Sequence, residues 1–303
     1  MAEELPLETK PLLILAGPTS AGKTAAAIAL AEQWNPRFIS ADAMQIYRGM
    51  DIGTGKLSVE MLERFPHAAI DIRDPHEAFN AVDFATLADA EIASATQEGR
   101  PVVLVGGTGL YFRALLEGFV KVPSGDDALR AEIEALPDLH AALSEVDPVL
   151  AERLHPHDHV RLTRGIEVFR ITGKPLSQFH AEHNPTPRHQ SVSLCLDRDG
   201  LYDRINARVI QMLDEGYLQE VESLRARGYS PANTKPMRSL GYRHLSEHLD
   251  GDLDLDESIR RTQRDTRHFA KRQRNLLRSL GGFEPCDAND MDRIQGAAQR
   301  AWG

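Results

Sequence analysis

The sequence predicts an α/β protein in which a parallel sheet is flanked by helices and carries a small all-helical insertion. Short apolar runs alternate with helix-like stretches over most of the chain, a pattern that is typical of a parallel sheet. Between about residues 123 and 187 the pattern changes to short helical segments separated by prolines. The length of 303 residues leaves room for one large core with such an insertion.

The individual elements follow from the spacing of apolar residues. We expect strands at Leu12–Ala16, Phe38–Ala41, Val102–Val105 and Ser191–Leu196. We expect the main helices at Lys23–Gln33, Phe84–Gln97, Val160–Ile171, Tyr202–Arg227 and Leu255–Leu280. The chain then divides into a first part of the core (residues 1–120), the helical insertion (121–188) and a second part of the core (189–303).

Composition excludes several classes of protein. With 42% hydrophobic and 26% charged residues, the chain is neither collagen-like nor intrinsically disordered. Its two cysteines are too few for a disulfide framework, and Glu3, Glu4 and Glu8 stand where a secretion signal would be basic. The first apolar run, Leu12–Ala16, is far too short to cross a membrane. We therefore expect a cytoplasmic protein with no membrane partner.

One motif indicates a phosphate site. Residues 17–24 fit the pattern G-x-x-x-x-G-K-[ST] directly after a predicted strand and before a predicted helix, which makes the sheet P-loop NTPase-like. The backbone N–H groups of such a loop bind phosphate oxygens, Lys23 adds a point charge, and Thr24 can bind Mg²⁺. The predicted phosphate-binding residues are Gly17, Pro18, Thr19, Ser20, Ala21, Gly22, Lys23 and Thr24. The motif does not specify the phosphate compound or the reaction.

The ends of the other predicted strands narrow the choice of reaction. An ATPase commonly has a metal-binding Asp at the end of an apolar strand, whereas Val102–Val105 runs into Gly106-Gly107-Thr108. The strand Phe38–Ala41 ends at Asp42, and the carboxyl ends of strands are where open α/β sheets hold their ligands. Asp42 is therefore a candidate general base, with a turn or helix-capping role as the alternative.

Several segments resemble, in order, the tRNA dimethylallyltransferase family. They are residues 17–24 (GPTSAGKT), 40–54 (SADAMQIYRGMDIGT), 104–118 (LVGGTGLYFRALLEG), 155–168 (HPHDHVRLTRGIEV), 238–243 (RSLGYR) and 266–273 (TRHFAKRQ). The resemblance extends from about residue 11 to 280. Two local departures are the order of Ser20-Ala21, which is the reverse of the order frequent in the family, and Arg274-Asn275 in place of a common threonine-tryptophan pair.

The resemblance implies a reaction and its participants. Members of this family transfer a dimethylallyl group from dimethylallyl diphosphate to the exocyclic amine of an adenosine next to the tRNA anticodon, using Mg²⁺. It implies Asp42, Thr108 and Lys23 as catalytic residues, with Thr108 and Arg238 at the diphosphate. The residues that it implies at the tRNA are Asp42, Ala43, Met44, Gln45, Thr108, Arg130, Val160, Arg161, Leu162, Thr163, Arg164, Arg238, Ser239, Leu240, Gly241, Tyr242 and Arg243. We expect the enzyme to be a monomer.

The placement of charge also favours an RNA partner. The net charge is −10, yet residues 259–280 contain eight basic residues and one acid. Spacings of three and four place six of these on one helix stripe: Arg260, Arg264, Arg267, Lys271, Arg274 and Arg278. We expect this basic stripe, Arg267 and Lys271 in particular, to contact tRNA phosphates, with a solvated charged face as the alternative. On the opposite side, Gln273 and its neighbours are expected to line a substrate channel.

Three other functions remain open at this point. A P-loop small-molecule kinase would share the phosphate loop and the neighbouring acid, and an isopentenyltransferase for free adenine nucleotides would not need the insertion. A non-enzymatic RNA-binding protein would bind tRNA without releasing diphosphate. His155, His157 and His159 alternate at a spacing that does not favour a zinc site, so we assign them none.

Overall fold

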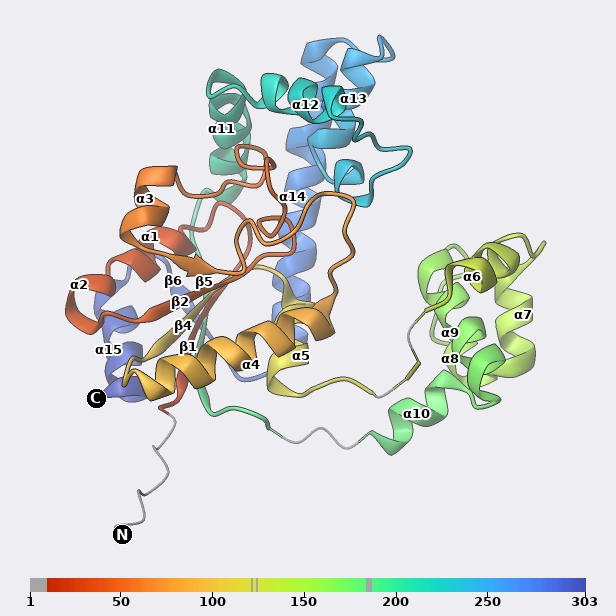
Figure 1. Ribbon diagram of the computed structural model, residues 1–303, viewed down its shortest axis with the longest axis horizontal. Helices are drawn as coiled ribbons and strands as arrows, with labels where there is room; N and C mark the ends of the chain where they lie inside the picture. Colours follow the sequence, from red (N-terminus) through yellow and green to blue (C-terminus); the bar gives the residue numbers. More distant parts are fainter. Residues whose placement is uncertain (1–9, 121, 124, 184–186) are drawn as a thin grey trace. The chain divides into compact units, whose positions relative to one another are not determined.

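A parallel sheet with six strands forms the centre of the larger part of the chain (Figure 1). The computed structural model describes residues 10–120, 122–123, 125–183 and 187–303. Within them the strand order is β3-β2-β4-β1-β5-β6. The strands are β1 (Leu12–Ala16), β2 (Arg37–Ala41), β3 (His67–Ala68), β4 (Val102–Gly106), β5 (Ser191–Asp197) and β6 (Phe283–Asp287). The predicted α/β class with a parallel, P-loop NTPase-like sheet is confirmed.

Strands β1 and β4 are apolar throughout because both faces of the sheet are covered. Every residue of these two strands is buried. On one face, Leu13, Leu15 and Val105 share a core with Ile294 and Trp302 of the last helix. Helix α4 (Ala81–Gln97) contacts β2 and crosses in front of the sheet in Figure 1. Burial on both faces therefore explains why these strands read as continuous apolar runs rather than as alternating ones.

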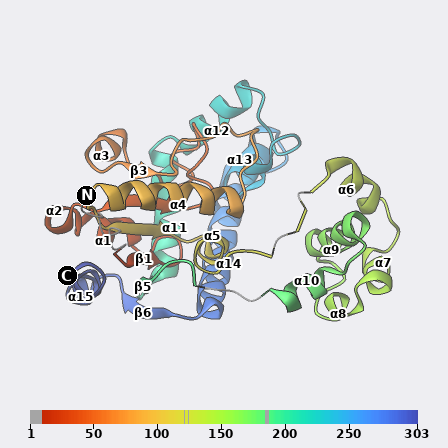
Figure 2. The same cartoon turned by 60° about the horizontal axis from the view of Figure 1, so that its bottom comes forward.

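Ten α-helices and one short 3-10 helix belong to this larger part, within the described residues. Besides α4 they are α1 (Lys23–Ile28), α2 (Ala31–Trp34), α3 (Val59–Arg64), α5 (Gly109–Leu116), α11 (Leu201–Asp214), α12 (Tyr217–Ala226), η1 (Lys235–Arg238), α13 (Tyr242–Leu249), α14 (Leu255–Leu280) and α15 (Met291–Trp302). Helix α14 contacts α11 and α13 as well as α5 and β6, and both Figure 1 and Figure 2 show it beside α5. It therefore connects the helices around α11 to α13 with the sheet.

Two predicted helices are wrong in extent. The single helix expected at Tyr202–Arg227 is two helices, α11 and α12, because Gly216 between them has a left-handed φ of 103°. The helix expected at Lys23–Gln33 is also interrupted, so that α1 ends at Ile28 and α2 starts at Ala31. By contrast, α14 has the predicted bounds, since the Asp254 side chain accepts the Glu257 N–H at 2.6 Å and caps its start.

The second compact unit, Glu117–Thr186, is all-helical in its described part. Its helices are α6 (Asp127–Glu134), α7 (Leu139–Val146), α8 (Pro148–Ala151), α9 (His159–Thr172) and α10 (Leu176–Glu182). It has a core of its own around Leu143, Leu162 and Ile166. The insertion predicted from the sequence covers 121–188, and its first residue, like residues 1–9 of the predicted core, lies outside the described residues. The larger unit comprises Met1–Leu116 and Pro187–Gly303.

Candidate active site

Three strand ends meet at one edge of the sheet and carry the predicted catalytic residues. Ala16 of β1 is in register with Gly106 of β4, and Gly106 is in register with Ala41 of β2. The next residues along the chain are therefore brought together: the phosphate loop after β1, Asp42 after β2 and Thr108 after β4. The structure thus places Lys23, Asp42 and Thr108 on adjoining segments.

The phosphate loop has backbone N–H groups available for an anion. In the described part of the chain, the N–H groups of Ser20, Gly22, Lys23 and Thr24 donate to no protein acceptor. They lie at the start of α1, where a helix favours negative charge. The Lys23 ammonium donates to the Pro18 carbonyl at 2.7 Å and so folds back over the loop. This arrangement offers hydrogen-bond donors and a positive charge of the kind that phosphate oxygens require.

Lys23 and Asp42 perturb one another at this site. Burial lowers the pKa of Lys23 to about 8, and the nearby Asp42 carboxylate opposes that change. Burial raises the pKa of Asp42, while the N–H group of Met44 and the charge of Lys23 act in the opposite direction. Both groups therefore titrate closer to neutrality than they would in water, which is common at sites of proton transfer.

Thr108 holds the backbone on both sides of Asp42. Its N–H donates to the Ala41 carbonyl at 3.1 Å, and its hydroxyl accepts the Ala43 N–H at 3.0 Å. The Asp42 carboxylate accepts the Met44 N–H at 2.9 Å. The resemblance implied a place for Thr108 at the diphosphate, and it did not indicate this support of the backbone around Asp42.

The segment after Asp42 is held from the opposite side by α12. The Glu220 carboxylate accepts the N–H groups of Asp51, Ile52 and Gly53 at 2.7–3.1 Å. It also accepts the Tyr242 hydroxyl at 2.6 Å. Within the segment, the Gln45 amide oxygen accepts the hydroxyl of Ser40 at 2.9 Å. These bonds fix the course of the chain that follows Asp42.

The predicted tRNA residues 238–243 divide between surface and interior. Arg238 is exposed and donates to the carbonyls of Pro231 and Ala232 at 2.7 and 3.2 Å. Tyr242 is buried, and Leu240 accepts the Tyr217 hydroxyl through its carbonyl. Ser239 and Gly241 lie between them, and Arg243 is bonded to Asp265 at 3.4 Å. Within the described residues, Arg238 does not contact the phosphate loop.

In the helical unit, three of the predicted tRNA residues form ion pairs: Arg130 and Arg164 with Glu167, and Arg161 with Asp158. Arg130 lies 2.9 Å from the buried Glu167 carboxylate, and Arg164 pairs with the same carboxylate. Although burial opposes it, the hydrogen bonds from Arg164 and from the Asp126 N–H lower the pKa of Glu167. At the start of α9, Val160 and Arg161 are exposed, whereas Leu162 and Thr163 are buried.

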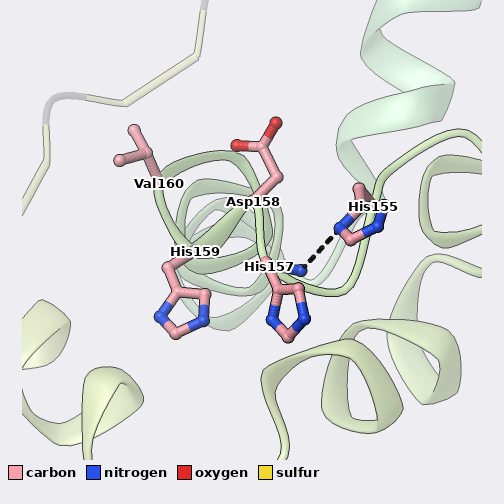
Figure 3. Close-up of a pocket in the computed structure, with 5 residues that line it drawn as sticks. All are labelled: His155, His157, Asp158, His159 and Val160. Carbon is pink, nitrogen blue, oxygen red and sulfur yellow. Dashed lines mark hydrogen bonds between the residues drawn. The ribbon is translucent and has the colours of Figure 1, made fainter.

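Figure 3 shows the turn before α9, where His155, His157, Asp158, His159 and Val160 surround an open pocket of about 360 Å³. The His157 N–H donates to the imidazole of His155 at 3.2 Å. The rings of His157 and His159 point to one side, and Asp158 and Val160 to the other. No cluster of three or more His, Cys, Asp or Glu able to hold a metal ion occurs in the part of the chain that is described.

The basic stripe of α14 is partly neutralised by acids of the same helix and of β5; Arg264, for example, pairs with Asp265 at 2.8 Å. Arg260 pairs with Glu257 at 2.9 Å, and Arg274 pairs with Asp197 of β5 at 2.6 Å. Arg267 donates to the Asn206 side chain of α11 at 2.5 Å. Lys271 is exposed and, within the described residues, forms no ion pair. Helix α14 thus bonds to β5 and α11 through some of its cations, and, among the described residues, Lys271 keeps an uncompensated positive charge.

Comparison with known proteins identifies the family. The profile described as IPP transferase matches residues 45–280. The tRNA dimethylallyltransferase of Geobacter metallireducens is 46% identical over 276 residues, which cover 88% of this chain and 89% of the relative. The chain belongs to the IPP transferase family. Its relatives are enzymes, so the prediction of a prenyltransferase-type enzyme is confirmed.

Solved structures agree with this family assignment. The tRNA isopentenylpyrophosphate transferase of Bacillus halodurans has a TM-score of 0.70 and 35% identity, over 96% of this chain and 95% of that one. A eukaryotic dimethylallyltransferase acting on tRNA has a TM-score of 0.78 and 27% identity, over 96% of this chain and 77% of that one. As for membranes, the described helices include none long and apolar enough to cross one.

The family departure at Ser20-Ala21 has a local explanation. The side chain of Ala21 is completely buried against Leu201 and Ile205 of α11 and Ala270 of α14. A hydroxyl at this position would be buried among apolar groups, which is costly without a hydrogen-bond partner. The second departure from the family pattern is Arg274-Asn275. There, Arg274 pairs with Asp197, the last residue of β5. Neither pairing was foreseen, since nothing in the sequence joins residues so far apart along the chain.

The lowered pKa of Lys23 leads to a prediction about anion binding. We expect Lys23→Ala to weaken the binding of inorganic diphosphate at pH 7 by roughly tenfold or more, since a charge-assisted hydrogen bond is lost. The difference between parent and variant should shrink as the pH rises above about 8, where Lys23 of the free protein loses its charge. Titration calorimetry from pH 6.5 to 9.5 measures both effects.

Because diphosphate itself titrates in this range, the informative quantity is the ratio of the two affinities at each pH. Lys10→Ala, at the opposite end of β1, is the control and should bind as the parent does. An affinity ratio close to one at every pH would assign the phosphate contact to the backbone alone.

Proposed function

We propose that the protein transfers the dimethylallyl group of dimethylallyl diphosphate to the N6 amine of the adenosine on the 3′ side of the tRNA anticodon, releasing diphosphate. The observation that carries this proposal is the pairing of a free phosphate loop with Asp42, whose pKa is raised, on the adjoining strand end. Membership of the IPP transferase family supports the same reaction.

The two sides of the site suit the two halves of the reaction. The bond from the allylic carbon to the diphosphate oxygen breaks, and its electron pair leaves with the diphosphate. The N–H groups of the phosphate loop and Lys23 stabilise that growing negative charge. Because this stabilisation is stronger in the transition state than in the bound substrate, it accelerates the reaction. The N6 lone pair forms the new carbon–nitrogen bond, and the Asp42 carboxylate accepts the N6 proton.

Mg²⁺ fits the side of this site that would hold the diphosphate of the allyl donor. The Thr24 hydroxyl lies in the first turn of α1 and, among the described residues, has no hydrogen-bond partner. Mg²⁺ is commonly bound by one or two protein oxygens together with substrate phosphates and water. Thr24 would hold it, and the ion would neutralise part of the diphosphate charge during departure.

The tRNA partner follows from the family and from the charge on α14. An adenosine stacked in the anticodon loop cannot reach a strand end inside the protein, so we propose that it is extruded into the site. The free cations of α14, including Lys271, are available for the RNA backbone. A cytoplasmic location suits the two free cysteines, Cys195 and Cys286. A monomeric state stays a prediction.

The alternatives are less well supported. A small-molecule kinase would need a phosphoryl acceptor site, and the matched relatives are named for dimethylallyl transfer rather than for phosphoryl transfer. An enzyme for free adenine nucleotides would not need the helical unit that this chain has. An RNA-binding protein without activity would not need a half-buried carboxylate of raised pKa beside the phosphate loop.

A transfer assay tests the proposed function. The protein is incubated with unmodified tRNA, Mg²⁺ and dimethylallyl diphosphate, and the digested nucleosides are weighed. We expect an adenosine heavier by one dimethylallyl group, and one diphosphate released for each adenosine modified. ATP in place of the allyl donor should give no product. Folded protein that binds both substrates and yields no heavier adenosine would refute the proposal.

Asp42→Asn separates base catalysis from positioning. The amide keeps the shape and the bond to the Met44 N–H, but it cannot accept a proton, so we expect single-turnover transfer to fall by roughly 10²- to 10⁴-fold. For the parent, the rate should rise with pH as Asp42 ionises, since its raised pKa delays formation of the carboxylate. This rise of the transfer rate with pH should be absent in the variant.

Both substrate affinities are measured separately, and thermal unfolding checks the fold of Asp42→Asn. The variant should be no less stable at neutral pH, because a carboxylate whose pKa is raised in the folded protein weakens folding once it ionises. Transfer at the parental rate would make Asp42 a turn residue, and a large loss of donor affinity with little loss of rate would make it a metal ligand.

The basic stripe leads to a prediction about salt. Lys271→Ala should reduce the slope of log affinity for tRNA against log salt by roughly 0.7 to 0.9, the amount expected for one lost phosphate contact. Arg260→Ala should reduce it less, because Glu257 already compensates that charge. Arg300→Ala, on α15, is the control with an unchanged slope. Equal slopes for all three variants and the parent would identify the stripe as a solvated charged face.

A further inference from the structure

One buried side chain of α14 joins the phosphate loop to the loop beside Asp42. Gln273 is 7% exposed. Its side-chain oxygen accepts the Thr19 N–H at 3.0 Å, and its side-chain nitrogen donates to the Gly107 carbonyl at 3.1 Å. The sequence suggested a place for Gln273 on the wall of a substrate channel. The structure instead buries it between two backbone segments.

The chemistry of the two contacts requires an amide. An N–H group must meet an acceptor and a carbonyl must meet a donor, so the orientation of the Gln273 amide is determined by its partners. An ionised glutamate would offer no donor to Gly107, and an apolar side chain would leave both backbone groups buried without a partner. Few side chains could make both bonds at this position.

Gly107 is shaped to admit this amide. A Cβ atom on Gly107 would lie 2.2 Å from the Gln273 nitrogen, closer than real Cβ contacts allow, and 3.0 Å from the Gly17 carbonyl oxygen, which is tighter than most real Cβ contacts. The absence of a side chain at residue 107 therefore lets the two loops and α14 approach one another. The glycine and the glutamine form one structural unit.

The bonds continue from Gln273 to Asp42. Thr108, the residue after Gly107, holds the Ala41 carbonyl and the Ala43 N–H on either side of Asp42. In the other direction, Thr19 belongs to the loop whose next N–H groups are free for an anion. Gln273 thus stands between the segment that would bind the leaving diphosphate and the segment that carries the base.

We propose that Gln273 is a positioning residue that sets the phosphate loop against the base Asp42, without touching either substrate. This inference rests on the proposed function for the identity of the two halves of the site. Transfer requires the leaving group and the base to be correctly placed at the same moment, and errors of about 1 Å can cost roughly 10²-fold in rate. Loss of the Gln273 amide should therefore affect the rate at saturating substrate.

The test uses two substitutions that differ in hydrogen bonding. Gln273→Met keeps the length of the side chain and removes both bonds. Gln273→Glu keeps an acceptor for Thr19, and when its carboxyl is protonated it regains a donor for Gly107. Gln263→Met is the matched control, since Gln263 lies on the same helix but donates to the Asn206 carbonyl of α11 at 3.1 Å.

Single-turnover transfer at saturating tRNA and donor, from pH 5.5 to 8.5, is compared with the parent at each pH. We expect Gln273→Met to be roughly 10- to 100-fold slower at every pH, with tRNA affinity within twofold of the parent. We expect Gln273→Glu to be slow at high pH and to recover relative to the parent as the pH falls. Gln263→Met should transfer at the parental rate.

A merely structural role would not produce a recovery with falling pH, and thermal unfolding identifies any variant that has lost its fold. If Gln273→Met does not fold, the test depends on Gln273→Glu alone. A ratio of its transfer rate to the parental rate that stays constant with pH then overturns the proposal. Parental rates for either folded variant at high pH also overturn it.

The affinity for inorganic diphosphate with Mg²⁺ separates this inference from the proposed function. If the parent makes no dimethylallylated adenosine, yet diphosphate affinity depends on Gln273 with the same recovery at low pH, the positioning role stands and the proposed reaction is wrong. If the parent transfers the group and neither rate nor diphosphate affinity responds to residue 273, the reaction stands and the positioning role is wrong.

Discussion

The site depends on the register of three parallel strands. Because β1, β2 and β4 run in the same direction and end level with one another, the residues that follow them are forced onto one edge of the sheet. Strand ends are also where backbone groups lose their sheet partners and must find others. Here the partners are other loops of the site, such as Thr108 for the backbone around Asp42. The requirement to satisfy these groups is what orders the catalytic segments.

Electrostatics adds a second constraint to that edge. A lysine and a carboxylate are kept close together at this edge. Partial burial favours the neutral form of each, while the charge of the other group favours its charged form. The balance leaves Lys23 able to lose its charge near pH 8 and Asp42 able to accept a proton. A diphosphate arriving at the loop adds negative charge beside both, which favours the protonated state of each. In the proposed reaction, donor binding and proton transfer would therefore be linked through the same pair of groups.

Much of the fold, but less of the site, could be predicted from the sequence. Strands β1, β2, β4 and β5 were predicted to within one residue, and burial on both faces explains why β1 and β4 are continuous apolar runs. Strands β3 and β6 were not predicted, because β3 has only two residues and β6 is mostly exposed. The predicted bounds of α14 agree with the cap at Asp254 and with Gly281 after its last turn. Residues 202–227 were predicted as one helix because the amphipathic pattern continues through Gly216. The helical backbone, however, is interrupted at that glycine. Contacts between distant residues, such as Arg274 with Asp197, have no signal in a single sequence.

Gln273 illustrates why a residue's role can be missed when its position is correctly predicted. Its place on α14, away from the basic stripe, follows from helical spacing, and that spacing is equally suited to a channel wall or to a buried bridge. What decides between them is the environment on that side of the helix, where Ala270 and Leu277 are fully buried against the protein and Gln273 meets two backbone segments. One helix therefore offers cations to solvent on one side and a hydrogen-bonded amide to the site on the other. A movement of α14 along its axis would disturb the contact between the phosphate loop and the Asp42 segment, so the fixed position of this helix is itself a condition for the proposed chemistry.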